Sequence, residues 1–231
     1  MDILTLNLLD ALLDAFSAAV CAALVWFMIK PYRFTGERRY VGLPLAFSFL
    51  TASYILGFVS YFESIPTVDV IRWLSLFSQS YAFAFLAVTY YFSNKQEEKI
   101  QLPLNIFYAA ILSAIAISYI VIFVPPSFAW PDFKTGDDYM RAFNIICLSY
   151  VAVHTLRSHA SKPDAKTIWI PLSYILFDFT QYSFLIWSLD SSFSAFVGAH
   201  FLRIAGLLIF LYVAYQTFYK SKEEYPKKVI E

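Results

Sequence analysis

Seven long apolar stretches constrain this chain more than any other feature of its sequence. A helix needs about 20 mostly apolar residues to cross a bilayer, and each stretch is close to that length. Hydrophobic residues make up 59% of the chain and charged residues only 15%, which excludes an ordinary soluble domain. A transmembrane β-barrel would show short alternating segments instead of continuous runs. We therefore expect an all-α integral membrane protein with seven transmembrane helices, at about residues 9–29, 41–62, 71–93, 102–124, 140–156, 167–188 and 195–219.

Basic residues collect on one side of this predicted membrane. Of the 17 Lys and Arg residues, thirteen follow the first, third, fifth or seventh stretch, and basic loops stay in the cytoplasm. The distribution predicts a multi-pass protein of the cell membrane with its N-terminus outside and its C-terminus inside. No Lys or Arg precedes the first stretch, so the chain lacks the basic start of a cleaved signal peptide. We expect this helix in the mature protein.

The stretches also repeat at an offset of 127 residues. Asp10 aligns with Asp137 and Pro44 with Pro171, and no gap is needed through three helices and two loops. A duplication explains this spacing; the alternative is convergent helix spacing imposed by a fixed bilayer thickness. With one helix between them, the repeats are parallel, in a three-plus-one-plus-three architecture. The single membrane domain of residues 1–231 then holds repeat one at about 9–95, a linker helix at about 102–124 and repeat two at about 136–222.

Polar residues inside the predicted spans mark a candidate ligand site, because each is costly in a membrane and usually faces a cavity or a partner. Counting 1.5 Å per residue places them about 6 to 15 Å below the outer boundary, with Asp178 deepest. The inner half of the spans is almost purely apolar. The candidate ligand-binding residues are Asp14, Gln79, Asp178, Gln181, His200 and Arg203.

The depths of Asp178 and Arg203 agree to within about 4 Å, so we expect these two residues to form an ion pair. The pair is either a structural clamp between the last two helices or the floor of an outward-facing polar pocket. The positions aligned with Asp178, Gln181, His200 and Arg203 in the first half are uncharged: Thr51, Tyr54, Trp73 and Leu76. This difference favours a specialised site in the second half.

The outer loop at 124–141 is rich in Pro, aromatic and acidic residues and is a candidate cover for this pocket. For Phe128, Trp130 and Phe133, an aromatic belt at the membrane interface is the simpler interpretation.

Catalytic and cofactor chemistry finds no support in the sequence. His154 and His200 lie near opposite membrane boundaries and cannot share a haem iron. Cys21 and Cys147 lie inside predicted helices without metal-site spacing, which suggests buried packing residues. No Lys lies centrally in a span, so a retinal Schiff base is excluded. We expect no catalytic residue, no metal and no cofactor, and as partners the lipid bilayer, a small extracytoplasmic ligand and a membrane or cytoplasmic protein, but no nucleic acid.

Two families resemble this chain. The segments 32–62, 71–92 and 199–218, with a His-x-x-Arg start to the last helix, resemble the seven-helix sensor regions that precede bacterial and archaeal histidine kinases. This resemblance implies a sensing or small-ligand module, with His200 and Arg203 at the matching positions and without an attached output domain. In length, topology and repeats the chain is also similar to SWEET sugar transporters, although their Pro-Gln helix motif is replaced by Pro-Leu.

Three functions follow as hypotheses. The leading one is a non-enzymatic seven-helix sensor or accessory subunit with an outward-facing polar pocket. The second is a small-solute transporter, which needs a pathway to both faces that the apolar inner half opposes. The third is a structural subunit of a larger membrane complex, which would present small or polar residues to a partner.

Overall fold

The computed structural model describes residues 3–35, 41–62, 67–93, 97–123, 132–163 and 167–217. Within these ranges the chain is all-helical, with seven α-helices and no strand. The helices are α1 (Ile3–Thr35), α2 (Gly42–Ser60), α3 (Thr67–Ser93), α4 (Glu97–Phe123), α5 (Phe133–Ser161), α6 (Trp169–Asp190) and α7 (Phe193–Tyr215).

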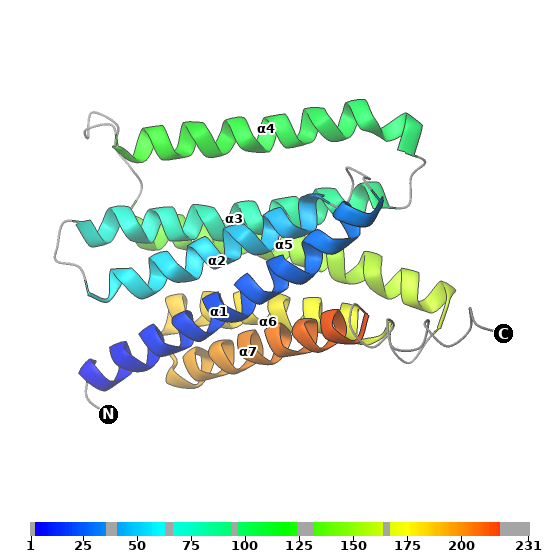
Figure 1. Ribbon diagram of the computed structural model, residues 1–231. Coiled ribbons are helices and arrows are strands. Elements are labelled where there is room, and N and C mark those ends of the chain that lie inside the picture. Colours follow the sequence, from blue (N-terminus) through cyan, green and yellow to red (C-terminus); the bar gives the residue numbers. More distant parts are fainter. Residues whose placement is uncertain are drawn as a thin grey trace.

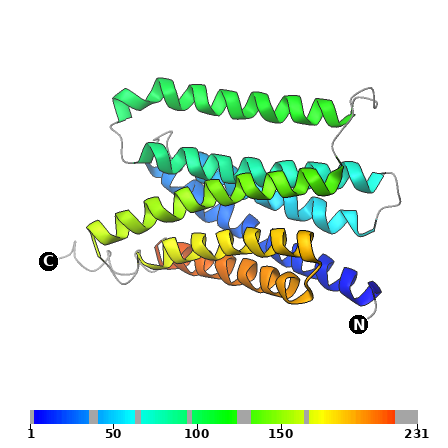
Figure 2. The same ribbon diagram turned by 180° about the vertical axis from the view of Figure 1, so that it is seen from behind.

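Six of these helices form a closed ring. α1 packs against α2, α2 against α3, α3 against α5, α5 against α6, α6 against α7, and α7 returns to α1. The helix α4 lies outside the ring and packs mainly on α3, as the two ribbon views show (Figure 1 and Figure 2). The described ends of the chain lie near opposite ends of the bundle (Figure 1). The ring therefore encloses an interior, and each of the described helices except α4 faces it.

The buried positions of α1 show how the sequence directs one helix face inward. A single helix face recurs at three- and four-residue spacing, and the buried residues that follow this spacing are Ala11, Asp14, Ala18, Cys21 and Leu24. Large apolar side chains such as Trp26 point outward and are exposed. Exposed apolar side chains on this scale suit contact with lipid rather than water.

Within the described ranges, four helices contain segments that are long and apolar enough to cross a membrane, which identifies a membrane protein in a lipid bilayer environment. These segments are Leu8–Lys30, Gly42–Ser60, Gln101–Ile122 and Phe193–Tyr215.

Aromatic side chains fill the middle of the ring. Phe47 of α2 and Tyr174 of α6 both pack edge-on against Phe210 of α7, with ring centroids 5.7 and 4.7 Å apart. Phe83 of α3 meets Phe177 of α6 in the same way at 6.4 Å. All five side chains are at most 3% exposed. We call these five residues the aromatic plug, because they are buried and packed together inside the ring.

Hydroxyl groups attach α4 to the ring. The hydroxyls of Ser78 and Tyr119 are 2.8 Å apart, and those of Tyr81 and Ser118 are 2.5 Å apart. Most other side chains of α4 are exposed, including Ile106 and Ile117. This helix therefore adds little to the enclosed interior.

Candidate functional site

A cavity of about 630 Å³ opens at one end of the ring. Its lining comes from all six ring helices and from no described residue of α4. Asp10 near the start of α1, Tyr61 just after α2 and Phe193 at the start of α7 all line it, which places the cavity where α1, α3, α5 and α7 begin. The sequence predicts this end to be the outer one.

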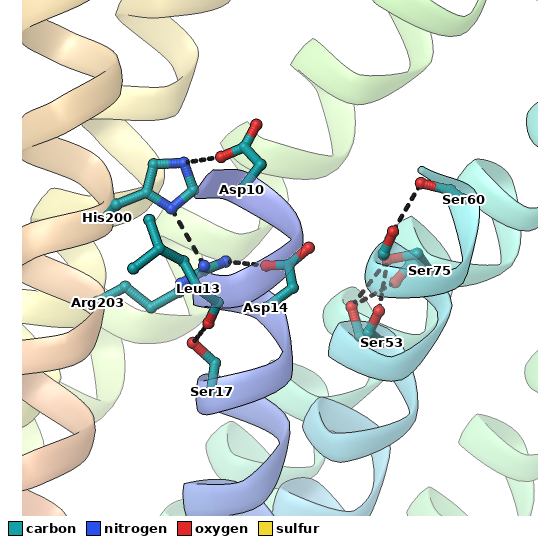
Figure 3. A network of polar contacts seen from close by, with 10 residues as sticks. Asp10, Leu13, Asp14, Ser17, Ser53, Ser60, Ser75, His200 and Arg203 are labelled. Atoms are coloured by element: carbon teal, nitrogen blue, oxygen red, sulfur yellow. Dashed lines mark hydrogen bonds and ion pairs between the residues drawn. The ribbon is translucent and has the colours of Figure 1, made fainter. Parts of the chain in front are cut away.

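A buried ion pair joins α1 and α7 beside the cavity. Arg203 Nη1 lies 2.8 Å from Asp14 Oδ1, and the residues are only 4% and 8% exposed (Figure 3). The guanidinium carbon also lies 4.9 Å from the centre of the Tyr54 ring on α2, within the range of a cation–π contact. A buried charge is tolerated when it is paired and hydrogen-bonded. Arg203 thus connects three helices at one point.

His200 extends this network by one helical turn. Its Nδ1 lies 3.1 Å from Arg203 Nη2, and its Nε2 lies 2.8 Å from Asp10 Oδ1 (Figure 3). A guanidinium can only donate, so Nδ1 accepts and the ring proton resides on Nε2. His200 Nε2 and Asp10 Oδ1 are close, but their geometry lacks the alignment of a hydrogen bond. Neither atom therefore has a hydrogen-bond partner. The ring itself packs edge-on against Phe196 and Phe184.

Two serines and a glycine shape the side of the cavity formed by α2 and α3. Ser53 and Ser75 each donate to the backbone carbonyl of the other at 2.9 Å, which clamps α2 to α3. They stand across from the Asp14 side of the network in Figure 3. A Cβ added at Gly57 would collide with Asp14 Oδ2. Glycine at this position lets the carboxylate lie directly against α2.

The helix α5 contributes a second ion pair to the cavity wall. Arg141 Nε donates to Asp137 Oδ2 at 2.6 Å, one turn earlier on the same helix. The guanidinium carbon lies 4.8 Å from the centre of the Phe184 ring. A third arginine, Arg72 of α3, also lines the cavity but is exposed and has no ion-pair partner among the residues the structure describes.

Four of the six predicted site residues line the cavity: Asp14, Gln79, His200 and Arg203. Asp178 and Gln181 do not. They bind α5 instead, where Ser149 Oγ donates to Asp178 Oδ2 at 2.7 Å and Asn144 Nδ2 donates to Gln181 Oε1 at 3.2 Å.

The predicted ion pair between Asp178 and Arg203 is therefore wrong. Arg203 pairs with Asp14 of α1, while Asp178 faces α5. Asp178 and Arg203 have similar predicted depths, but the Asp178 side chain points toward α5 and the Arg203 side chain points toward α1.

Sequence reasoning missed four charged residues of the cavity. Two signals in the sequence could have found three of them. Asp10 lies four residues before Asp14, on the same helix face, and Asp137 and Arg141 are the positions aligned with these two at the 127-residue offset. Nothing in the sequence singles out Arg72.

The remaining sequence predictions fall partly outside the described chain. Residues 124–131 of the proposed loop cover are not among the described ranges, although Phe133 does line the cavity and packs edge-on against Trp73. Cys21 and Cys147 are buried and unpaired, as expected for packing residues. Within the described ranges, no group of three or more His, Cys, Asp or Glu side chains is placed to hold a metal ion. No protein-family model, curated protein or solved structure matches this chain.

Proposed function

We propose that this protein is a non-enzymatic membrane sensor, or the accessory subunit of one, that binds a small ligand in the cavity. The observation that carries this proposal is the composition of the wall: three aspartates, three arginines and a histidine surround about 630 Å³ of space inside a ring of apolar helices. Pockets for small molecules commonly measure about 300–1,000 Å³ and hold a few convergent polar groups.

We further propose that all seven helices cross the membrane, with the N-terminus outside. Three helices of the ring, α1, α2 and α7, are long and apolar enough to cross. α3, α5 and α6 pack alongside them and complete the same ring. Their polar groups, such as Asn144 and Gln181, bond to each other across the helix interface, which lowers the cost of placing them in lipid. In this orientation the cavity faces the outside, because the basic loops are cytoplasmic.

The aromatic plug favours binding over passage. The five plug side chains are nearly fully buried, and the residues that surround them, such as Leu24 and Leu207, are apolar. A polar solute that entered the cavity would have to displace these packed rings to pass deeper into the ring. Binding at a closed site can alter helix packing and so pass a signal to a separate protein. The resemblance to sensor regions is consistent with this, because His200 and Arg203 both line the cavity.

One observation favours a transporter as the second candidate. Several cavity-lining residues align with each other at the 127-residue offset, including Asp10 with Asp137 and Asp14 with Arg141. α2 begins at residue 42 and α6 at residue 169, which repeats the same offset. The ring contacts repeat as well: α1 with α2 corresponds to α5 with α6, and α3 with α5 to α7 with α1. We propose a parallel three-plus-one-plus-three repeat on this basis, with the cavity between its halves, where repeat-built transporters bind substrates.

The two functions are separated by reconstituting the purified chain into liposomes. Radiolabelled amino acids, sugars, nucleosides and organic acids are tested for binding and for accumulation. We expect at least one solute to bind without accumulating, and Arg203→Leu to abolish this binding because it removes the charge at the centre of the network. Arg157→Leu, at an exposed position near the other end of α5, should leave binding unchanged. Uptake by the native chain that Arg203→Leu abolishes would contradict the sensor proposal and support the transporter.

A further inference from the structure

The charges of the cavity do not all neutralise one another. Arg203 pairs with Asp14, and Arg141 pairs with Asp137. The wall contains six Asp and Arg residues, and two of them, Asp10 and Arg72, belong to neither pair.

No arginine or lysine among the described residues forms an ion pair with Asp10, and the residue beside it is His200. Arg203 Nη2 donates to His200 Nδ1, so the imidazole carries a single proton, on Nε2, and is neutral. A neutral imidazole cannot cancel the charge of a carboxylate. His200 Nε2 and Asp10 Oδ1 also have no aligned hydrogen-bond partner, although His200 is only 7% exposed. These two atoms face each other at 2.8 Å, so a ligand would bond to the lone pairs of the Asp10 carboxylate that do not face His200.

Arg72 lies at a similar level on α3, another helix of the cavity wall. The Tyr54 ring of α2 lies against the Arg203 guanidinium. Ser53, the residue before Tyr54, is hydrogen-bonded to Ser75 of α3. Ser75 therefore lies on α3 at about the level of the buried ion pair. Arg72 precedes Ser75 by three residues, or about 4.5 Å of helix, toward the mouth. Asp10 precedes Asp14 by four residues, or about 6 Å, in the same direction. Among the residues that the structure describes, one aspartate and one arginine that do not pair with each other or with another Asp or Arg therefore lie near the mouth on different helices.

We infer that the ligand of this cavity is a small zwitterion that carries an ammonium group and a carboxylate, as amino acids do. The ammonium group donates to Asp10, and the carboxylate accepts from the Arg72 guanidinium. The paired residues below, Asp14 and Arg203, then form a neutral floor. This inference rests on the proposed ligand-binding function and specifies the chemistry of its ligand.

The test compares alanine with two analogues that each lack one charge. Purified full-length protein is placed in phosphatidylglycerol nanodiscs, and calorimetry measures the affinity for glycine, alanine, γ-aminobutyrate, ethylamine and propionate. We expect at least one zwitterion to bind roughly tenfold or more tightly than both ethylamine and propionate, because each lost charged hydrogen bond costs at least that factor.

Two variants report which group recognises which charge. Asp10→Asn should remove the preference for alanine over propionate, and Arg72→Gln should remove the preference for alanine over ethylamine. Asp69→Asn is the matched control, because this carboxylate is exposed on α3 near Arg72 but does not line the cavity. A change of selectivity separates charge recognition from a general loss of structure, which would weaken all probes in the same proportion.

A zwitterionic lipid headgroup shares this chemistry and is the other source of the ligand. Replacing phosphatidylglycerol by phosphatidylethanolamine distinguishes the two: a headgroup in the cavity lowers the affinity for alanine, whereas a soluble ligand binds equally in both lipids. The inference is overturned if no zwitterion binds in either lipid, if propionate or ethylamine binds as tightly as the best zwitterion, or if Asp10→Asn weakens alanine and propionate equally. Binding of a sugar that Arg203→Leu abolishes would overturn the ligand class while leaving the proposed function intact.

Discussion

Arg203 links the chemistry of the site to the packing of the bundle. Its guanidinium contacts Asp14 of α1, Tyr54 of α2 and His200 of its own helix. The contact with Asp14 belongs to the interface that closes the ring between α7 and α1. A residue in this position cannot be changed without an effect on stability, so its functional role has to be tested through pairs of changes.

The pairing of Asp14 with Arg203 predicts a strong energetic coupling. Asp14→Asn and Arg203→Gln should each lower the free energy of unfolding in detergent by about 3–5 kcal/mol, because each leaves a buried charge without its partner. The double variant should lose less than the sum, by about 1–3 kcal/mol. Asp178→Asn combined with Arg203→Gln is the control, and its losses should add to within about 0.5 kcal/mol. Additive losses for Asp14 and Arg203 would show that they do not pair.

Two glycines give a second test at this scale. Gly57→Ala forces a Cβ against Asp14 Oδ2 and should cost about 1–3 kcal/mol of unfolding free energy. Gly198→Ala meets no atom within 4 Å and should be neutral or stabilising by up to about 1 kcal/mol, because alanine is the better helix former. Thermal unfolding measures both. A Gly57→Ala variant as stable as Gly198→Ala would contradict the close approach of Asp14 to α2.

The site residues could be predicted from the sequence only in part, for a physical reason. Helix rise gives the expected depth of a residue in the membrane, and depth singled out Asp14, His200 and Arg203, which line the cavity. Pairing depends also on the angle at which each side chain leaves its helix and on which helices are neighbours. Asp178 has a suitable depth but faces α5, so depth alone gave Arg203 the wrong partner.

At the scale of the helix, hydropathy located every element but not its ends. The fifth stretch was predicted at 140–156, whereas α5 extends over Phe133–Ser161. Charged residues such as Asp137 and Arg141 end an apolar run without ending a helix, since their backbone hydrogen bonds are unaffected. Hydropathy measures the part of a helix that suits lipid, and a helix can continue beyond it.

The position of α4 and the order of the ring were beyond prediction from the sequence. α7 closes the ring on α1, which is the helix most distant from it in the chain, and α4 is left outside on α3. The apolar pattern of α4 does not distinguish it from a ring helix. Its few polar contacts with α3 involve tyrosines and serines, which are too common to signal an interface.

These contacts predict that α4 can be loosened without disturbing the cavity. The double change Tyr81→Phe with Tyr119→Phe removes two hydroxyl bonds between α3 and α4. It should cost about 1–2 kcal/mol of unfolding free energy, because such bonds in membranes contribute about 0.6 kcal/mol on average. The coupling between Asp14 and Arg203 should stay unchanged. Tyr139→Phe, at an exposed position, is the control and should have no effect. A reduced coupling in the double variant would show that α4 supports the ring.

For the whole molecule, the arrangement of the cavity and the aromatic plug matters most. The charged groups gather at one end of the ring, and large aromatic side chains fill its middle. Aligned positions of the two proposed repeats contribute to both regions: Asp10 and Asp137 line the cavity, and Phe47 and Tyr174 belong to the plug. We therefore propose that the polar site is open to one side of the membrane and closed to the other.

Sided labelling of single cysteines tests this central claim most directly. Cys21 and Cys147 are buried and are first replaced by alanine. Ser60→Cys then places a thiol on the cavity wall, Phe210→Cys places one in the plug, and Ile55→Cys places one on the outward face of α2. In intact cells, a membrane-impermeant maleimide should label Ser60→Cys from outside and should leave Phe210→Cys and Ile55→Cys unlabelled. Labelling of Ser60→Cys only in inverted vesicles, or labelling of Phe210→Cys from either side, would contradict a cavity that opens outward and closes at the plug.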